Sequence, residues 1–200
     1  MIIETIDDRP DRSSIRLPKF DYSQPGCYFI TICAFRMRCL FGRIENAHVL
    51  LSQTGFAVRA RWIDVPHHFP NVDIDAFVVM PNHFHGIVVV KERARRAVPL
   101  QDRGEAFQHP MPASIPTIVR SFKASVTRHV RSQSRKSDIE VWQSNYFERV
   151  IRDGPEFAKI SHYICCNPAM WHIDVDNPVR RGTAPPCPSG LSWLNPPSLR

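Results

Sequence analysis

The sequence has no stretch approaching the roughly 20 apolar residues that a membrane-spanning helix needs. Its apolar runs, such as Ile87 to Val90, have only the length of a strand. The N-terminal segment MIIETIDDRPDR carries early acidic residues and no apolar core, so it lacks the pattern of a signal peptide. The six cysteines include no Cys-x-x-Cys pair, which disfavours a zinc finger and favours reduced thiols. We therefore expect a cytoplasmic protein without a membrane segment.

Positive charge and proline are in excess. The 26 Lys and Arg residues outnumber the 19 Asp and Glu residues, giving a net charge of +7. Such a balance favours a polyanionic partner, most often nucleic acid, although many basic proteins bind none. The 18 prolines exclude a long coiled coil, and the 43% of hydrophobic residues is enough to form a core.

Composition divides the chain into one domain and three less ordered segments. Residues 1–24 are polar and aperiodic and are expected to form an N-terminal tail. Residues 91–112 mix Arg, Pro and Gly, which indicates a basic mobile loop. Residues 177–200 are rich in proline and are expected to be a disordered tail. A single domain is therefore predicted for residues 25–176.

Periodicity and turn residues predict the elements of this domain. Because Pro81 cannot lie inside a central strand, the segment 72–90 is expected to form two strands joined tightly at residues 80–82. Pro168 is expected to help end the last helix near residue 167. The elements are a strand at 26–35, a strand or hairpin at 41–51, a helix at 52–67, the two strands of 72–90, a helix at 115–130, a strand within 139–151 and a helix at 155–167. This order predicts an α+β fold of the ferredoxin-like class, with an antiparallel sheet and helices mainly on one face.

The helix at 115–130 has an apolar face and a basic face. The apolar positions are Ile115, Ile118, Val119, Phe122, Val126 and Val130. The basic positions are Arg120, Lys123, Arg128, Arg131 and Arg135. A salt-bridged surface would mix charges of both signs, so this face is a candidate nucleic-acid contact, although a solvated face is the usual meaning of such a pattern. Arg36 and Arg38 either contact nucleic acid as well or simply face solvent.

His83 and His85 lie two residues apart in a predicted strand, so both side chains leave the same face. A neutral imidazole nitrogen offers a lone pair to a metal near neutral pH. The pair is therefore a candidate metal site, although such a spacing also arises by chance in a chain with nine histidines.

The last predicted helix carries a polar ridge of Lys159, Tyr163 and Asn167, each one turn from the next. Beside it runs an apolar stripe that should pack on the sheet and bring the ridge to a sheet face. Lys159 adds a candidate nucleic-acid contact. The simpler alternative is that the ring of Tyr163 only packs and that Asn167 caps the helix end.

A tyrosine hydroxyl, with a pKa of about 10, is a poor nucleophile at neutral pH unless a metal polarises its target. Two histidines and the amide oxygen of Asn167 would leave positions open on a hard divalent cation for water or phosphate. Tyr146 is the rival nucleophile, but it lies in an extended aromatic segment where a packing role is the simpler interpretation.

Five segments resemble one family of DNA-processing enzymes. The segment VVMPNHFHGIVVV resembles the His-hydrophobe-His motif of the single-tyrosine HUH transposases, and SHYICCNPAMW resembles their nucleophile helix. The segments DYSQPGCYFITICAFRMRCLFG, RSFKASVTRHV and VWQSNYFERVIRD resemble the REP-associated tyrosine transposase branch. The five matches occur in the family order and span about residues 21–177.

The resemblance implies a compact ferredoxin-like domain that acts on single-stranded DNA bearing a hairpin, such as a repetitive extragenic palindrome. His83, His85 and Asn167 would hold Mg²⁺ or Mn²⁺. Tyr163 would attack the scissile phosphate, giving a 5′-phosphotyrosine link and a free 3′-OH. Because some relatives combine residues of two subunits, a homodimer is also an expectation.

Two other functions stay open at this point. The chain could be a domesticated DNA-binding protein that keeps the fold but does not cleave. It could also be a metal-dependent hydrolase that uses water and forms no covalent intermediate. A trapped protein–DNA adduct would distinguish the transposase-type enzyme from both alternatives.

Overall fold

The computed structural model describes residues 21–92, 113–134 and 138–178. Residues 1–20 of the predicted N-terminal tail, residues 93–112 of the predicted loop, Arg135 and residues 179–200 of the predicted C-terminal tail lie outside these ranges. Within the described ranges, no helix is both long enough and apolar enough to cross a membrane.

An antiparallel sheet of four strands, in the order β4-β5-β1-β6, forms the centre of the fold. The central strand β1 (Gly26–Cys33) pairs with β5 (His83–Val90) on one side and with β6 (Phe147–Ile151) on the other. The edge strand β4 (Val72–Val79) pairs with β5. The predicted α+β class with an antiparallel sheet is confirmed.

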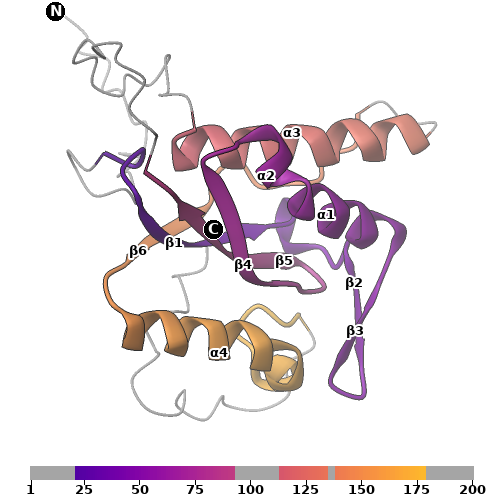
Figure 1. The fold of residues 1–200 in the computed structure, drawn as a ribbon. Coiled ribbons are helices and arrows are strands. Elements are labelled where there is room, and N and C mark those ends of the chain that lie inside the picture. Colours follow the sequence, from indigo (N-terminus) through magenta and orange to yellow (C-terminus); the bar gives the residue numbers. More distant parts are fainter. Residues whose placement is uncertain (1–20, 93–112, 135–137, 179–200) are drawn as a thin grey trace, which may run out of the picture.

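Helices cover both faces of this sheet (Figure 1). On one face lie α1 (Gln53–Ile63), α2 (Val65–His68) and α3 (Ile115–Gln133), and on the other lies α4 (Gly154–Met170). Along the chain, the strands of the sheet alternate with the longer helices in the order β1, α1, β4, β5, α3, β6. The helix α4 follows β6. Among the α-helices of the described ranges, α1, α2 and α3 thus share a face, as expected, and α4 covers the opposite face.

Side-chain caps fix where two of the helices begin. The Ser52 hydroxyl accepts from the Gly55 N–H at the start of α1. The Asp153 carboxylate accepts from the Glu156 N–H at the start of α4, and the Glu156 carboxylate in turn accepts from the Arg152 N–H. The starts of α1 and α4 are therefore positioned by local sequence as well as by packing.

The smaller elements include a hairpin of β2 (Gly42–Glu45) and β3 (His48–Leu51). Its two-residue turn places Asn46 and Ala47 at positive φ, as a turn that matches the twist of the strands requires. Two short 3-10 helices complete the fold, η1 (Phe35–Met37) after β1 and η2 (Trp171–Ile173) after α4.

Three boundaries differ from the sequence-based expectation. Tyr22 is buried against Tyr28, so the folded domain includes part of the predicted tail. The predicted strand within 139–151 pairs in the sheet only from Phe147, because residues 139–146 run beside α3 with a single bridge, from Trp142 to Ala34 directly after β1. The helix α4 continues through Pro168 to Met170, since a proline removes one helical N–H but does not prevent a final turn.

Candidate active site

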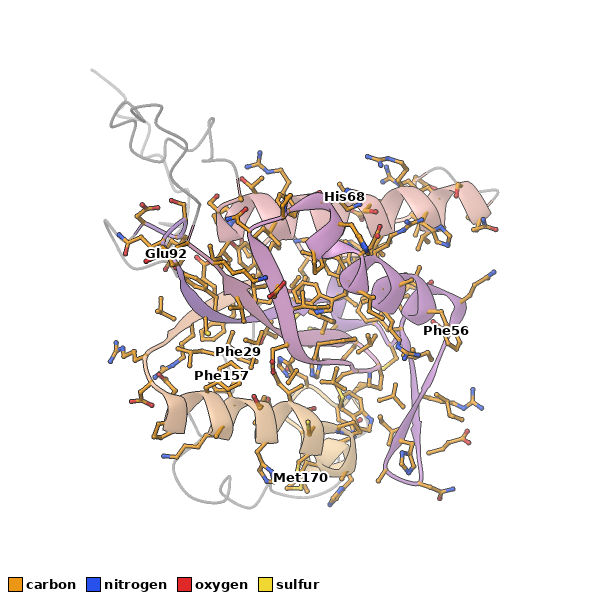
Figure 2. All side chains as sticks on the ribbon, viewed as in Figure 1. Phe29, Phe56, His68, Glu92, Phe157 and Met170 are labelled. Atoms are coloured by element: carbon orange, nitrogen blue, oxygen red, sulfur yellow. The ribbon has the colours of Figure 1, made fainter. Side chains whose placement is uncertain are left out.

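The helix α4 packs on the sheet through a small apolar cluster that is separate from the main core. Figure 2 shows Phe157 of α4 and Phe29 of β1 in the layer between helix and sheet. The buried members of this cluster are Phe29, Ile87, Ile151, Ile160 and Ile164. The predicted apolar stripe of α4 thus contacts the sheet, and the polar ridge beside it comes to the same face.

His83 and His85 lie on this face of β5, with their ring centroids 4.6 Å apart. Both are buried, at 0% and 2% relative exposure. Phe29 stacks on the ring of His85 at a centroid distance of 5.4 Å. The structure therefore brings the two predicted ligands together at a buried position, largely out of contact with solvent.

Burial also decides the charge of the two imidazoles. It lowers the pKa of His83 to about 3, and burial together with the neighbouring His83 lowers the pKa of His85 well below its ordinary value. Both rings are consequently neutral at pH 7, which is the form that donates a lone pair to a metal.

Tyr163 reaches the histidine pair from α4. Its hydroxyl lies 3.3 Å from Nε2 of His85, and its ring meets Phe29 edge-on at 6.3 Å between centroids. The rival nucleophile Tyr146 instead packs against the main core on the other face and donates its hydroxyl hydrogen to Glu148, at 2.8 Å. Of the two candidate tyrosines, only Tyr163 lies at the histidines.

Asn167 lies one turn after Tyr163 on α4. Tyr163 is next to His85, and Trp171, one turn beyond Asn167, has its ring centroid 6.1 Å from that of His83. Asn167 therefore lies between these two contacts along the helix, facing the histidine pair. It is 3% exposed, so the structure brings this third predicted ligand to the same place.

Two acceptor atoms at this place have no hydrogen-bond partner among the described residues. They are Nε2 of His83 and Oδ1 of Asn167, both fully buried. A buried polar atom without a partner is unfavourable, and coordination to a cation would satisfy an atom of this kind. Within the described ranges, no group of three or more His, Cys, Asp or Glu side chains is placed to hold a metal ion, and the amide oxygen of Asn167 is the third predicted ligand. The residues present fit a hard divalent cation.

Two supporting residues were not anticipated from the sequence. Thr31 of β1 places Oγ1 2.8 Å from Nδ1 of His85, its partner in strand register. Asn82 places Oδ1 2.9 Å from Nδ1 of His83. The position of Asn82 directly before His83 could have suggested that it contacts the histidine. An asparagine in a turn is also common, so the sequence alone does not distinguish the two roles.

The predicted DNA-contacting cations are distributed over both sides of the sheet. Arg120, Arg128 and Arg131 are exposed on α3, on the face opposite the histidines, whereas Lys159 is exposed on α4. Arg36 and Arg38 are exposed in and after η1, which follows the Cys33 end of β1. Arg131 also donates through Nε to the carbonyl oxygen of Ile139, at 3.2 Å.

Lys123 corrects the expectation of a solvent-facing basic row. Its side chain is partly buried, and its ammonium group donates to the carbonyl oxygens of Gln143 and Ser144. Burial lowers its pKa to about 8. The helical wheel places Lys123 on the polar side of α3, but it does not show that the segment after Ile139 covers this position.

Two adjoining surface clefts connect the basic helix to the histidine side of the sheet. One, of about 610 Å³, is lined by residues that include Arg128 and Arg131, and the other, of about 870 Å³, by residues that include Arg36 and Cys33. The shared lining residues are Glu140, Trp142, Gln143 and Ser144. Cys33, which lines the second cleft, is the register partner of His83 in the neighbouring strand.

Comparison with solved structures identifies the fold. A REP-associated tyrosine transposase, solved with a REP hairpin bound, superposes with a TM-score of 0.51 at 19% sequence identity. The match covers 77% of this chain and 72% of that one. A candidate transposase from Deinococcus radiodurans covers 70% of this chain and 89% of its own, at 16% identity and a TM-score of 0.41. The chain has the fold of the REP-associated tyrosine transposase, as the resemblance of its motifs implies.

Comparison of sequences identifies the family. An uncharacterized protein of Haemophilus influenzae is 43% identical over 166 residues, which is 82% of this chain and 91% of the relative. The chain belongs to the same family as this protein. No family model matches the sequence.

Proposed function

We propose that the protein is a transposase-type enzyme that cuts and rejoins single-stranded DNA bearing a hairpin. Tyr163 is its nucleophile, and His83, His85 and Asn167 hold Mg²⁺ or Mn²⁺. The observation that carries this proposal is the meeting of a tyrosine hydroxyl, a neutral histidine pair and an unpartnered amide oxygen on one buried face.

In the reaction, the Tyr163 hydroxyl oxygen forms a bond to the scissile phosphorus, and the bond from phosphorus to the 3′-oxygen breaks. The hydroxyl proton ends on the departing 3′-oxygen, so the products are a 5′-phosphotyrosine and a free 3′-OH. Resealing reverses these steps without another energy source. A divalent cation, when bound, would supply the positive charge that polarises the phosphodiester.

The surrounding residues have separate tasks in this proposal. Phe29 holds the ring of Tyr163 edge-on and stacks on His85, which fixes the nucleophile relative to the histidines. Lys159, exposed one turn before Tyr163, is placed to attract the phosphate that the tyrosine attacks.

The DNA is proposed to follow the clefts that join α3 to the histidine side. Arg120, Arg128 and Arg131 would contact its phosphates on α3, and Arg36 and Arg38 would do so near the candidate metal site. The REP hairpin bound by the transposase of similar fold supports a hairpin-bearing strand as the substrate class. A cytoplasmic location and assembly as a homodimer remain parts of the proposal.

Adduct formation tests this function directly. Purified protein is incubated with a 5′-overhanging hairpin oligonucleotide and Mn²⁺, and the products are separated under denaturing conditions. A covalent protein–DNA species is expected, and peptide mapping should place the DNA on Tyr163. Tyr163→Phe keeps the packed ring and should give neither nick nor adduct, whereas Tyr146→Phe is the matched control and should retain both.

The other outcomes select the alternatives. Cleavage without an adduct at any time would favour the water-using hydrolase. Hairpin binding without cleavage across a panel of hairpins would favour the domesticated DNA-binding protein. An adduct on Tyr146 would overturn the assignment of the nucleophile.

A further inference from the structure

Asn82 occupies an unusual position in the turn between β4 and β5. It is fully buried, although turn residues are mostly exposed. Its Nδ2 group donates to the carbonyl oxygen of Asp176, at 2.6 Å, and to that of Met37, at 3.3 Å. The side chain therefore ties the turn to η1 and to the segment Asp174–Asn177 that follows α4.

These two bonds determine which way the amide points. The reversed amide would place Oδ1 against two carbonyl oxygens, which are all acceptors and would repel one another. The observed orientation leaves Oδ1 facing Nδ1 of His83, at 2.9 Å. Since a carbonyl oxygen only accepts hydrogen bonds, Nδ1 must carry the hydrogen.

The tautomer of His83 follows from this geometry. With the hydrogen on Nδ1, a neutral imidazole has its lone pair on Nε2, the atom that has no partner among the described residues. Nothing comparable holds for His85, because the hydroxyl of Thr31 can either donate to or accept from its Nδ1. Asn82 thus acts on one ligand of the candidate site and not on the other.

We propose that Asn82 is a positioning residue that prepares His83 to bind the cation, and that docking of the segment Asp174–Asn177 on its amide strengthens that preparation. This inference rests on the proposed function for the identity of the ligands. Because the same amide contacts both partners, cation binding and docking of the segment are coupled. If docking of the segment raises the affinity for the cation by some factor, then cation binding must raise the equilibrium constant for docking by the same factor.

Two variants separate the two contacts of the amide. Asn82→Leu keeps a similar volume but can hold neither His83 nor the segment. Asn82→Asp keeps an acceptor for the Nδ1 hydrogen but places an oxygen against the carbonyl groups of Asp176 and Met37. Tyr28→Phe, which removes one hydrogen bond on the opposite face, is the control for general loss of stability.

The first measurement requires no metal. Nitrogen-15 spectra of the imidazoles should show His83 with its hydrogen on Nδ1 in the wild type, in Asn82→Asp and in Tyr28→Phe. Asn82→Leu should lose this preference. A wild-type His83 with its hydrogen on Nε2 would overturn the proposal, whatever the protein does to DNA.

The second measurement uses Mn²⁺ alone. Asn82→Leu should weaken Mn²⁺ binding by about 10-fold to 100-fold, the usual effect of losing a group that orients a ligand. In the wild type, saturating Mn²⁺ should slow hydrogen exchange at the amides of Asp176 and Asn177, which donate to Asp174. Asn82→Asp should expose these amides.

The outcomes distinguish this inference from the proposed function. If Mn²⁺ binds the wild type and not His83→Ala, but Asn82→Leu binds it as the wild type does, the positioning role is wrong and the metal site stands. If Mn²⁺ leaves the two amides unchanged, the coupling is wrong. If the wild type binds no Mn²⁺ but His83 shows the expected tautomer and its dependence on Asn82, the orienting role stands and the metal site is wrong.

Discussion

The hydroxyl of Tyr163 and Nε2 of His85 lie 3.3 Å apart, although 78 residues separate them in the sequence. The contact exists because the apolar stripe of α4 packs on the face of the sheet to which His85 points. Phe29, in the strand beside β5, contacts both rings and fixes their distance. A variant that shifts α4 should therefore affect the nucleophile and its neighbour together.

The first prediction concerns the cation. His83→Ala should abolish DNA cleavage and weaken Mn²⁺ binding, because it removes the proposed ligand atom Nε2, which has no partner among the described residues. Binding of single-stranded DNA should remain close to the wild-type level, since the exposed cations supply it. Calorimetry with Mn²⁺ and a gel-shift assay in chelator measure the two effects. Full wild-type cleavage in excess chelator would contradict the metal dependence.

Much of the site could be predicted from local sequence. The period of a strand places His83 and His85 on one face, and the period of a helix aligns Tyr163 with Asn167. The apolar stripe of α4 predicts that the Tyr163 face of this helix meets the histidine face of β5. The cluster around Ile160 shows that the stripe does pack on the sheet.

Other parts depend on contacts that local patterns do not contain. The burial of Lys123 depends on the carbonyl groups of Gln143 and Ser144, which lie in an irregular segment without periodicity. The role of Asn82 depends on the carbonyl oxygen of Asp176, 94 residues away. Irregular segments are located by tertiary packing, so neither contact follows from propensity or spacing.

A second prediction concerns Gly86, which lies between His85 and Ile87 in β5. An added Cβ would lie 2.8 Å from a ring carbon of Trp62 and 2.9 Å from the ring of Phe84. Both rings are fully buried and have no room to move. Gly86→Ala should therefore destabilise the fold by about 1–3 kcal/mol in chemical denaturation.

Gly154→Ala is the matched control for this substitution. Gly154 begins α4, and a Cβ there would meet nothing within 4 Å. Its free energy of unfolding should be unchanged or slightly increased, since alanine limits the unfolded chain more than glycine does. Equal stability of the two variants would show that β5 and α1 are not packed as closely as described.

The third prediction concerns the basic face of α3. The double variant Arg120→Glu with Arg128→Glu reverses two exposed charges, whereas Lys123 is left unchanged because its ammonium group is already bonded. Loss of two phosphate contacts should reduce the log–log salt slope of single-strand binding by about 1.4, at about 0.7 for each contact.

The control for this experiment is Arg59→Glu, which reverses an exposed charge on α1. It should leave the salt slope unchanged, because Arg59 is outside the proposed DNA path. Binding is measured by fluorescence anisotropy at several salt concentrations. If the double variant keeps the wild-type slope, the α3 cations form only a solvated surface.

The last prediction concerns Asp176, whose side chain lines the cleft beside Cys33. Burial, with the nearby charge of Asp174, raises the pKa of Asp176 to about 6 from its ordinary value of 3.8. The folded state therefore holds a proton that the unfolded state has released between these two pH values. The stability of the wild type should accordingly contain a contribution that falls as pH rises from about 4 to 6 and stays low above that.

Asp176→Asn keeps the shape of the side chain and the backbone carbonyl that Asn82 contacts, but it removes the cost of ionising a buried carboxyl group. Its free energy of unfolding should exceed that of the wild type at pH 7.5, by up to about 3 kcal/mol at 1.36 kcal/mol per pKa unit, and the difference should largely vanish at pH 4. The wild type and Asp176→Asn both contain His83 and His85. The acid sensitivity that these buried imidazoles cause therefore cancels when the two free energies of unfolding are subtracted. Asp138→Asn removes an exposed carboxylate and should change stability little at either pH. Urea denaturation at the two pH values gives the comparison, and an Asp176→Asn variant that is less stable than the wild type at pH 7.5 would show that the carboxylate is ionised and favourably paired in the fold.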